Sequence, residues 1–446
     1  MSATPESSIS VRIALAGLGT VGQASLRLLL DHAPAFLHKH HVQLELVAIL
    51  DRSHSSKDTS WIGEGVQLTD SVEEFLESPA DVVVELIGGM EPAGRIVRSS
   101  LGEGKAVVTG NKLLMSYCGT ELLELAHQFK TYLGFEAAVA GGIPIIRVIE
   151  RSLFSDRIVR VRGILNGTCN YILSEMSDRG RDYGEALSQA QSLGYAESDP
   201  TLDVSGQDTA DKLAILATLC FSTKVLPTDI PTRGITEIST VDFLYARRLN
   251  CAIKLLGRVD GDSEELKLRV SPFLINNHIP LSKISGVFNA VEVTGETLGA
   301  VVISGEGAGG GPTAVSVVAD ILNAALWKRI QSMGERLDES SLEQVTVVQR
   351  ATTKPQVSLK KEKYPFYLRF IVRDRPGIIS ELADILARRR ININSVLQEA
   401  WSDYSQLPFV ITVEPTQFSM IEEAVEEMAS LEFNCCPPLA LPMLNG

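Results

Sequence analysis

The feature that most constrains the fold is a short apolar segment followed at once by spaced glycines. Residues 11–16 are mainly apolar, Gly17, Gly19 and Gly22 come next, and apolar residues recur at helical spacing over residues 20–30. A strand, a G-x-G-x-x-G turn and a helix in this order form the dinucleotide-binding unit of a parallel sheet. The helix N-terminus then offers free N–H groups to a pyrophosphate. A plain tight turn is the alternative, but the flanking strand and helix favour a nucleotide site formed by Gly17, Gly19, Thr20, Val21 and Gly22.

Further apolar runs over residues 42–50, 81–87 and 106–109 predict more buried strands of the same sheet. The first of these runs ends in Asp51 and Arg52. A carboxylate at this place accepts the ribose hydroxyls of NAD, whereas an arginine can receive the 2′-phosphate of NADP. The two neighbours favour different coenzymes, so the preference between NAD and NADP stays open.

The strand at residues 106–109 delivers Asn111 and Lys112 to its carboxyl end, where open α/β sheets bind ligands. An amine there can contact the nicotinamide ribose or a substrate oxygen. A helix-capping Asn111 beside a solvated Lys112 is an equally good interpretation of the sequence alone.

Charge and cysteine content narrow the class of protein. The net charge of -14 argues against nucleic acid and anionic membranes as partners. The six cysteines show no paired metal spacing, no apolar run reaches the ~18 residues of a membrane span, and the start lacks a signal pattern. We therefore expect a cytoplasmic protein with reduced thiols.

The remaining chain predicts two further units. Residues 145–304 mix helical and strand patterns, and a second glycine-rich turn over residues 304–313 precedes an apolar helix. That turn could return to the cofactor; a flexible linker is the alternative. Residues 331–362 are polar and are interpreted as a linker, and residues 363–446 follow a βαββα order, with a possible last strand near Cys435, typical of a ferredoxin-like domain.

The segment from Gly194 to Lys212 holds the densest group of charges beside an apolar helix. Asp208 and Lys212 stand four residues apart and therefore share one helix face. A capped helix start with a solvated ion pair is the simple interpretation. The alternative is a pocket in which carboxylates hold a small cationic substrate beside a proton-donating lysine.

Taken together, these motifs resemble the homoserine dehydrogenase family, in the form that carries a C-terminal ACT domain. The most specific segments are residues 163–172, 194–200 and 203–212, with support from the glycine turns and from residues 109–112. The resemblance implies a Rossmann-type NAD(P)-binding domain over residues 1–144, an α+β substrate-binding and dimerisation domain over 145–330, and an ACT domain over 363–446. It also implies reversible NAD(P)H-dependent reduction of L-aspartate 4-semialdehyde to L-homoserine, on the route to threonine, methionine and isoleucine.

The resemblance also assigns roles to residues. Lys212 matches the acid/base lysine, Lys112 the lysine near nicotinamide and substrate, and Gly194 and Gly307 line the cofactor. Cys169 stands where the family often has threonine, which puts one hydroxyl contact in doubt. Glu197 and Asp208 match the substrate-binding carboxylates of the family, and Asp203 is expected to be a further one. A monovalent cation, Na+, is expected at Glu136, Val139, Gly141 and Ile143. An amino-acid effector, L-threonine, is expected at Asp374, Gly377, Ile378 and Asn394.

Two other functions remain open at this stage. Another amino-acid-linked Rossmann oxidoreductase, such as an aspartate-type dehydrogenase, would share the nucleotide fold and is separated by its activity on aspartate. An inactive amino-acid sensor would use only the ACT domain, but the presence of both Lys112 and Lys212 argues against it. For a homoserine dehydrogenase, a homodimer or a homotetramer is expected.

Overall fold

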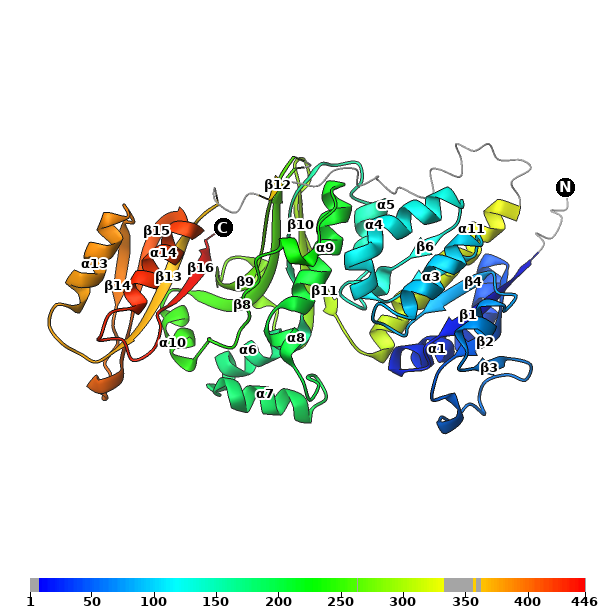
Figure 1. The fold of residues 1–446 in the computed structure, drawn as a ribbon, viewed down its shortest axis with the longest axis horizontal. Helices are drawn as coiled ribbons and strands as arrows, with labels where there is room; N and C mark the ends of the chain where they lie inside the picture. Colours follow the sequence, from blue (N-terminus) through cyan, green and yellow to red (C-terminus); the bar gives the residue numbers. More distant parts are fainter. Residues whose placement is uncertain (1–7, 263, 333–355, 358–361, 446) are drawn as a thin grey trace.

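The structure is a computed structural model that describes residues 8–262, 264–332, 356–357 and 362–445. The molecule is elongated: a parallel sheet with its helices lies at one end, a second sheet in the middle, and the C-terminal segment at the other end (Figure 1). The predicted fold class, a Rossmann-type parallel sheet followed by an α+β part and a ferredoxin-like C-terminal part, is confirmed.

The N-terminal part is a six-stranded sheet with helices on both faces. Its elements are β1 (Ile9–Ala16), α1 (Thr20–His40), β2 (Val42–Leu50), β3 (Gln67–Thr69), α2 (Val72–Leu76), β4 (Val82–Glu85), α3 (Ala93–Gly102), β5 (Ala106–Thr109), α4 (Lys112–Gln128), β6 (Leu133–Gly134) and, much later in the chain, α11 (Gly310–Ser332). The strand order is β3-β2-β1-β4-β5-β6, and every pair is parallel. The order changes direction beside β1, which creates the crevice where such sheets bind ligands.

The two-residue repeat of β1 explains how its helices are placed. Ile13 and Leu15 pack in a cluster with α1 and α11, whereas Ala14 and Ala16 pack against α2 and α3 on the opposite face. The helix that follows the second glycine-rich turn therefore completes the N-terminal part, although about 270 residues separate α1 from α11 in the sequence.

The central part is an antiparallel sheet with helices on one side. Its elements are α5 (Ile145–Arg151), β7 (Ile158–Ile164), α6 (Gly167–Arg179), α7 (Tyr183–Ser192), α8 (Thr201–Val204), α9 (Gln207–Phe221), α10 (Thr240–Arg248), β8 (Cys251–Gly261), β9 (Glu265–Asn276), β10 (Phe288–Gly295) and β11 (Gly299–Glu306). The order β11-β10-β7-β8-β9 is antiparallel throughout. Helices α6 and α9 pack against it, as Figure 1 shows in green.

Sequence analysis did not predict strands β8 and β11. Most of β8 is buried from Cys251 to Val259, so its pattern lacks the alternation of a half-buried strand. Strand β11 is an edge strand of small and partly exposed residues, and its last three residues, 304–306, were interpreted as the start of the glycine-rich turn.

The C-terminal part has the predicted βαββα order followed by one more strand. Its elements are β13 (Lys363–Val372), α13 (Ile378–Arg388), β14 (Ile393–Leu397), β15 (Leu407–Gln417), α14 (Phe418–Ala429) and β16 (Leu439–Leu444). The last strand thus begins after Cys435, the position near which it was expected. The short elements of the chain are η1 (His54–Ser56), η2 (Glu136–Ala138), η3 (Pro227–Asp229), η4 (Pro280–Lys283), η5 (Tyr404–Gln406) and β12 (Gln356–Val357); apart from β12, most of the expected linker lies outside the described residues.

Strand β16 joins the C-terminal sheet to the central one. It pairs antiparallel with β13 and parallel with β9, so the sheet order continues β9-β16-β13-β15-β14. Helix α10 adds a buried polar contact: Asp242 accepts hydrogen bonds from Arg369 at 2.6 Å and from the hydroxyl of Tyr367 at 2.9 Å. The C-terminal part is therefore attached to the central part by backbone pairing and by a buried ion pair.

Among the described residues, no helix is both long enough and apolar enough to span a bilayer.

Candidate active site

The glycine turn after β1 has the geometry of a pyrophosphate cradle. Gly17 has φ of 104°, a left-handed value that favours glycine, and a Cβ on Gly22 would lie 2.0 Å from the carbonyl oxygen of Gly17. A Cβ on Gly19 would meet nothing within 4 Å, so the space beside that residue is open. The first N–H groups of α1 have no acceptor inside the helix and can bind phosphate oxygens. Residues 17–22 therefore fit a dinucleotide.

Asp51 at the end of β2 holds the same turn in place. Its carboxylate accepts a hydrogen bond from the backbone N–H of Leu18 at 2.8 Å and pairs with the ammonium of Lys57 at 2.8 Å. Partial burial opposes the charge, but the hydrogen bonds from Lys57, Leu18 and Ser53 lower the pKa of Asp51 to about 2. The neighbouring Arg52 is exposed. The carboxylate of Asp51 suits the ribose hydroxyls of NAD, and the neighbouring Arg52 suits the 2′-phosphate of NADP, so this site fits either coenzyme.

A buried glutamate fixes the ends of β4 and β5. Glu85 accepts the backbone N–H of Gly88 at 2.9 Å and the hydroxyl of Thr109 at 2.6 Å. Asn111 then caps α4 by accepting the N–H of Leu114 at 3.0 Å. The capping interpretation of Asn111 is thus confirmed. The side chain of Lys112 is 43 % exposed, as expected for a solvated lysine, but its ammonium also pairs with Asp208.

Helix α9 brings the second lysine to the same place. The helix begins after Gly206, which has φ of 88°, and Asp208 lies in its first turn. The ammonium of Lys212 contacts Asp208 at 2.8 Å and also donates to the carbonyl oxygen of Leu165 at 2.8 Å. One carboxylate, only 3 % exposed, therefore holds two lysines that come from different parts of the chain, Lys112 and Lys212.

Asn166 completes the group of carboxylates. This residue caps α6 by accepting the N–H of Cys169 at 2.7 Å, and its amide donates to Asp203 at 2.7 Å and to Asp208 at 2.8 Å. Sequence analysis quoted the segment but gave Asn166 no role. An asparagine between a strand and a helix is a recognisable cap signal, but its bonds to two distant carboxylates follow only from the fold.

The electrostatics of the site favour the charged forms of Asp208 and Lys112. Burial disfavours the Asp208 carboxylate, but the ammonium groups of Lys212 and Lys112 outweigh it and hold its pKa well below the ordinary value. Burial likewise opposes the charge of Lys112, and Asp208 reverses the effect and raises the pKa of Lys112. The pKa of Asp203 is raised by burial, although Asn166 donates a hydrogen bond to it.

Two predicted site residues lie outside these contacts. Glu197 is exposed, and within the described residues its carboxylate makes no hydrogen bond or ion pair. Gly194 forms an exposed turn at the end of α7 with φ of 75°. Their loop is tied to the edge of the site, because Thr168 in the first turn of α6 donates to the carbonyl of Tyr195 at 2.7 Å.

The glycine-rich turn before α11, residues 307–310, which we call the glycine loop, lies between the nucleotide turn and the lysines. A Cβ on Gly310 would come within 3.1 Å of Thr20 at the start of α1. A Cβ on Gly307 would lie 2.1 Å from the side-chain amide of Asn289 on β10. The loop is thus packed in place, which does not support its interpretation as a flexible linker.

The expected cation site has its polar atoms already engaged. The carboxylate of Glu136 accepts the backbone N–H groups of Ile146 at 2.8 Å and Arg147 at 2.9 Å, and so caps α5. The carbonyl of Gly141 accepts the hydroxyl of Ser316 at 2.6 Å. The donor set that remains for a cation consists of backbone carbonyl lone pairs, which suits a weakly bound monovalent ion better than a carboxylate-coordinated metal. Groups of three or more His, Cys, Asp or Glu side chains that could hold a metal are absent from the described residues.

The expected effector residues lie on two neighbouring features of the C-terminal part. Asp374 and Gly377 belong to the exposed turn between β13 and α13, and Gly377 has φ of 96° at the start of that helix; Ile378 is buried beneath it. Asn394 is exposed on the edge strand β14 and donates to Thr412 at 3.2 Å. Among the described contacts, none joins Asn394 directly to the turn.

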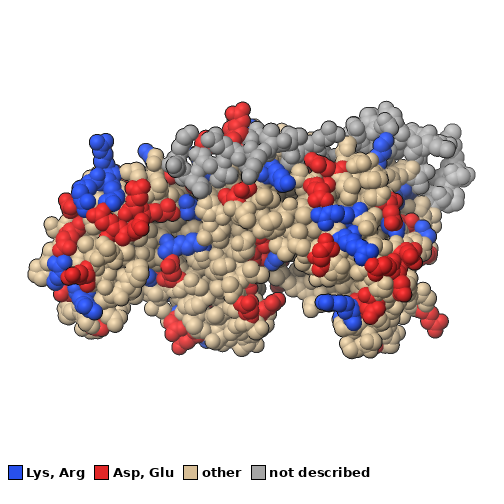
Figure 2. Space-filling view, in the orientation of Figure 1, with Lys and Arg blue, Asp and Glu red and all other residues tan. Residues whose placement is uncertain are grey.

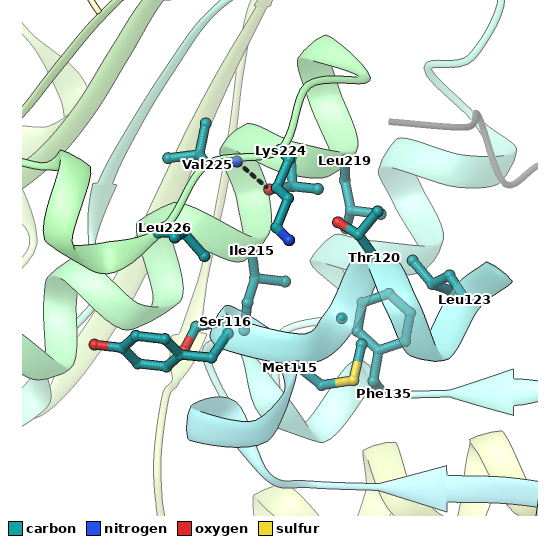
Figure 3. A pocket seen from close by; sticks show the side chains of 13 residues that line it. Met115, Ser116, Thr120, Leu123, Phe135, Ile215, Leu219, Lys224, Val225 and Leu226 are labelled. Carbon is teal, nitrogen blue, oxygen red and sulfur yellow. Dashed lines mark hydrogen bonds between the residues drawn. The ribbon is translucent and has the colours of Figure 1, made fainter. Parts of the chain in front are cut away.

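A separate pocket lies farther along the same two helices (Figure 3). It is lined by α4 and α9 beyond their lysines, by Phe135, and by residues 224–226 that follow α9, and its wall is mainly apolar. Its lining contains none of the predicted site residues. On the face shown in Figure 2, the described acidic and basic side chains are interspersed, and these side chains form no basic stripe of the kind that binds nucleic acid.

The fold and the site together define a class. A dinucleotide turn in a parallel sheet, with two lysines and a shared carboxylate at its carboxyl edge, is the arrangement of an NAD(P)-dependent oxidoreductase acting on a CH–OH group.

Comparison with known proteins narrows this class to one family. The sequence profile of homoserine dehydrogenase matches residues 144–322, the profile of its NAD-binding domain matches 17–136, and that of the ACT domain matches 366–433. A homoserine dehydrogenase of Synechocystis is 39 % identical over 428 residues, which cover 95 % of this chain and 97 % of the relative. The chain belongs to the homoserine dehydrogenase family, and its reaction interconverts L-aspartate 4-semialdehyde and L-homoserine with NAD(P).

Solved structures agree with this assignment. The crystal structure of a homoserine dehydrogenase from Thiobacillus denitrificans superposes with a TM-score of 0.85 at 32 % identity and covers 98 % of this chain and 99 % of its own. A hyperthermophilic archaeal homoserine dehydrogenase in complex with NADPH has a TM-score of 0.62 at 29 % identity, over 71 % of this chain and 98 % of its own.

Proposed function

We propose that Lys212 is the proton donor to the substrate carbonyl oxygen and that Lys112 and Asp208 complete the reacting site. The observation that carries this proposal is the single buried carboxylate of Asp208, which pairs with both lysines at the ligand-binding edge of the nucleotide fold. Asp208 thereby brings the ammonium groups of Lys112 and Lys212, which belong to two different helices, to one place.

The bound coenzyme supplies the hydride that reduces the aldehyde carbon of L-aspartate 4-semialdehyde. As the C=O bond becomes CH–OH, negative charge develops on the oxygen, and the ammonium of Lys212 stabilises it and delivers the proton. In the oxidation of L-homoserine, Lys212 as the neutral amine takes the same proton back. The Leu165 carbonyl, 2.8 Å away, and Asp208 orient the amine during both directions.

The substrate carries an ammonium and a carboxylate, so its site needs both signs of charge. Asp203 and Asp208 are joined by Asn166 into one acidic wall, to which we assign the substrate ammonium. Glu197, on the tethered loop beside α6, is the remaining carboxylate of the proposed substrate set. We assign Lys112, whose side chain is 43 % exposed, to the substrate or the nicotinamide ribose.

For the coenzyme, we propose contacts at Gly17, Gly19, Thr20, Val21, Gly22, Asp51, Arg52, Lys112, Gly194 and Gly307. NADPH bound to the archaeal relative supports NADP, whereas the carboxylate of Asp51 supports NAD. We also propose that Na+ binds the turn of Glu136, Val139, Gly141 and Ile143 through backbone carbonyls. Because all six cysteines are free thiols, we place the protein in the reducing cytoplasm.

We further propose that L-threonine inhibits the enzyme through the C-terminal domain. The free N–H groups at the start of α13 can receive an amino-acid carboxylate, and Asp374 can pair with its ammonium. Asn394 on the edge strand is the third contact. Strands β11 and β14 are the two end strands of the sheet that the described residues form, and an end strand can pair with another copy of the chain; we therefore propose a homodimer or homotetramer.

One steady-state assay tests the function and its regulation. We expect reduced coenzyme to form with L-homoserine far faster than with L-aspartate, in the presence of NAD+ or NADP+; faster turnover of L-aspartate would refute the substrate assignment. Added L-threonine should lower the rate for the wild type and not for Asp374→Asn. The matched control is Asp384→Asn, an exposed aspartate on α13 that should keep the inhibition. Deletion of the C-terminal part is a poor test, since it would also unpair β9 from β16.

A further inference from the structure

One buried side chain, Asn289, lies against the glycine loop and shares a hydrogen-bond acceptor with Lys212. This residue lies on β10, opposite Gly305 of β11, and is 1 % exposed. Its amide nitrogen donates to the carbonyl of Leu165 at 3.0 Å. The same carbonyl accepts the ammonium of Lys212 at 2.8 Å. A backbone oxygen has two lone pairs, so one carbonyl can serve both donors at once.

Asn289 also lies directly against the glycine loop. A Cβ on Gly307 would approach its side-chain amide to 2.1 Å, so only glycine allows the loop to pass so close. The other end of the loop, Gly310, lies beside Thr20 of the nucleotide helix. Contacts therefore run without a gap from the dinucleotide turn through the loop and Asn289 to the Leu165 carbonyl.

The hydrogen bonding of Asn289 is poorly explained by stability alone. Its side-chain oxygen is buried and has no partner among the described residues. A buried acceptor without a partner lowers stability, and an apolar side chain of similar size would remove that cost. The chain keeps an asparagine whose only side-chain hydrogen bond within the described structure is the one to the acceptor of Lys212.

We propose that Asn289 is a positioning residue that connects the glycine loop to Lys212 through the Leu165 carbonyl. The amide holds that carbonyl in the direction in which the Lys212 ammonium can donate to it, and the loop holds the amide. When the coenzyme orders the loop, it therefore also fixes Asn289 and the Leu165 carbonyl, and Lys212 is oriented before the substrate is reduced. This inference rests on the proposed role of Lys212.

The test compares two buried asparagines by substitution with leucine. Asn289→Leu should keep or raise the melting temperature, because it removes the unpartnered oxygen. It should lower kcat about tenfold, the effect of one lost hydrogen bond of ordinary strength, and leave the KM for homoserine nearly unchanged. The solvent deuterium isotope effect on kcat should rise, since proton transfer becomes the slower step.

The control is Asn170→Leu. Asn170 is equally buried, but its side chain accepts a hydrogen bond from the ammonium of Lys254 at 3.1 Å and donates to the carbonyl of Phe288 at 3.0 Å. Among the described residues, none of its side-chain hydrogen bonds reaches Leu165 or Lys212. Its replacement should lower the melting temperature and leave the isotope effect unchanged. The proposal is overturned if Asn289→Leu keeps kcat and the isotope effect within about twofold of the wild type, or if it mainly loses stability as Asn170→Leu does.

A second pair of variants tests the contact with the loop. Gly307→Ala alone places a methyl group against the amide of Asn289 and should raise the coenzyme KM and lower kcat. In an Asn289→Ser background, where the side chain is shorter, the same substitution should cost less, because both changes act on one contact. Additive effects would contradict the connection. If Lys212→Met is active, the proposed role of Lys212 as proton donor is wrong, whatever the result for Asn289.

Discussion

Replacement of Asp208 by asparagine should damage both stability and catalysis. Asp208 is 3 % exposed and carries the only carboxylate that pairs with both lysines among the described ion pairs. Loss of one partner of a buried ion pair costs roughly 3–5 kcal/mol, since the other charge stays buried. Lys112 is 43 % exposed and can turn toward water, whereas Lys212 is only 13 % exposed, so we expect the low end, about 3 kcal/mol. The loss of an oriented proton donor should lower kcat/KM by about 10²–10⁴-fold.

The pH dependence of this effect follows from the sign of the pKa shift. The folded-state pKa of Asp208 lies below its ordinary value of 3.8, so its stabilisation is complete above 3.8 and is lost as the pH falls through the folded pKa. Urea denaturation should therefore give a constant difference between wild type and Asp208→Asn at neutral pH, and a shrinking one in strong acid.

Asp211→Asn is the matched control on the same helix. Asp211 is also buried, but among the described residues its carboxylate accepts a hydrogen bond only from Gln207, at 3.0 Å, and burial raises its pKa. Its neutral replacement should leave the unfolding free energy at neutral pH unchanged or higher. If Asp208→Asn proves as stable and as active as Asp211→Asn, the reasoning about the shared carboxylate is wrong.

Three other predictions test separate parts of the structure. Gly19→Ala should weaken coenzyme binding, measured by quenching of protein fluorescence, because the new methyl group enters the open space where the pyrophosphate is expected; its melting temperature should stay unchanged. Gly22→Ala should also lower the melting temperature, because its Cβ overlaps a backbone carbonyl. Burial and Asp320 raise the pKa of Glu136 from 4.5 to about 7. The unfolding free energy, measured by urea denaturation, should therefore fall by up to about 1.4 kcal/mol per pH unit as the pH rises between these two values. A pH profile as flat as that of Glu136→Gln would contradict this prediction. Arg369→Met should destabilise the protein by about 3–5 kcal/mol in the same assay, since Asp242 is fully buried, and an effect under about 1 kcal/mol would show that this pair does not hold the C-terminal part in place.

The sequence predicted those parts of the site that depend on neighbouring residues. The nucleotide turn follows from glycine spacing between a strand and a helix, and the pairing of Asp208 with Lys212 follows from their i, i+4 spacing. The resemblance to a family then brought Lys112 and Lys212 into one site, and the structure pairs both with Asp208.

The parts that could not be predicted depend on contacts between distant segments. Asn166 and Asn289 act on residues that the central sheet brings beside them, and neither contact leaves a local pattern. Strand β8 lacked alternation because most of its residues are buried, and the attachment of β16 to β9 is a pairing across more than 160 residues. Strand partners of this kind are set by tertiary packing, not by local propensity.

The most direct test of the account compares two lysines, one within α9 and one just after its end. Lys212 is the proposed proton donor, whereas Lys224 lies after the helix on the pocket of Figure 3. Turnover of L-homoserine should fall by about 10²–10⁴-fold in Lys212→Met, with coenzyme affinity near that of the wild type, and should be unchanged in Lys224→Met. Equal turnover in the two variants would contradict the claim that Lys212 transfers the proton.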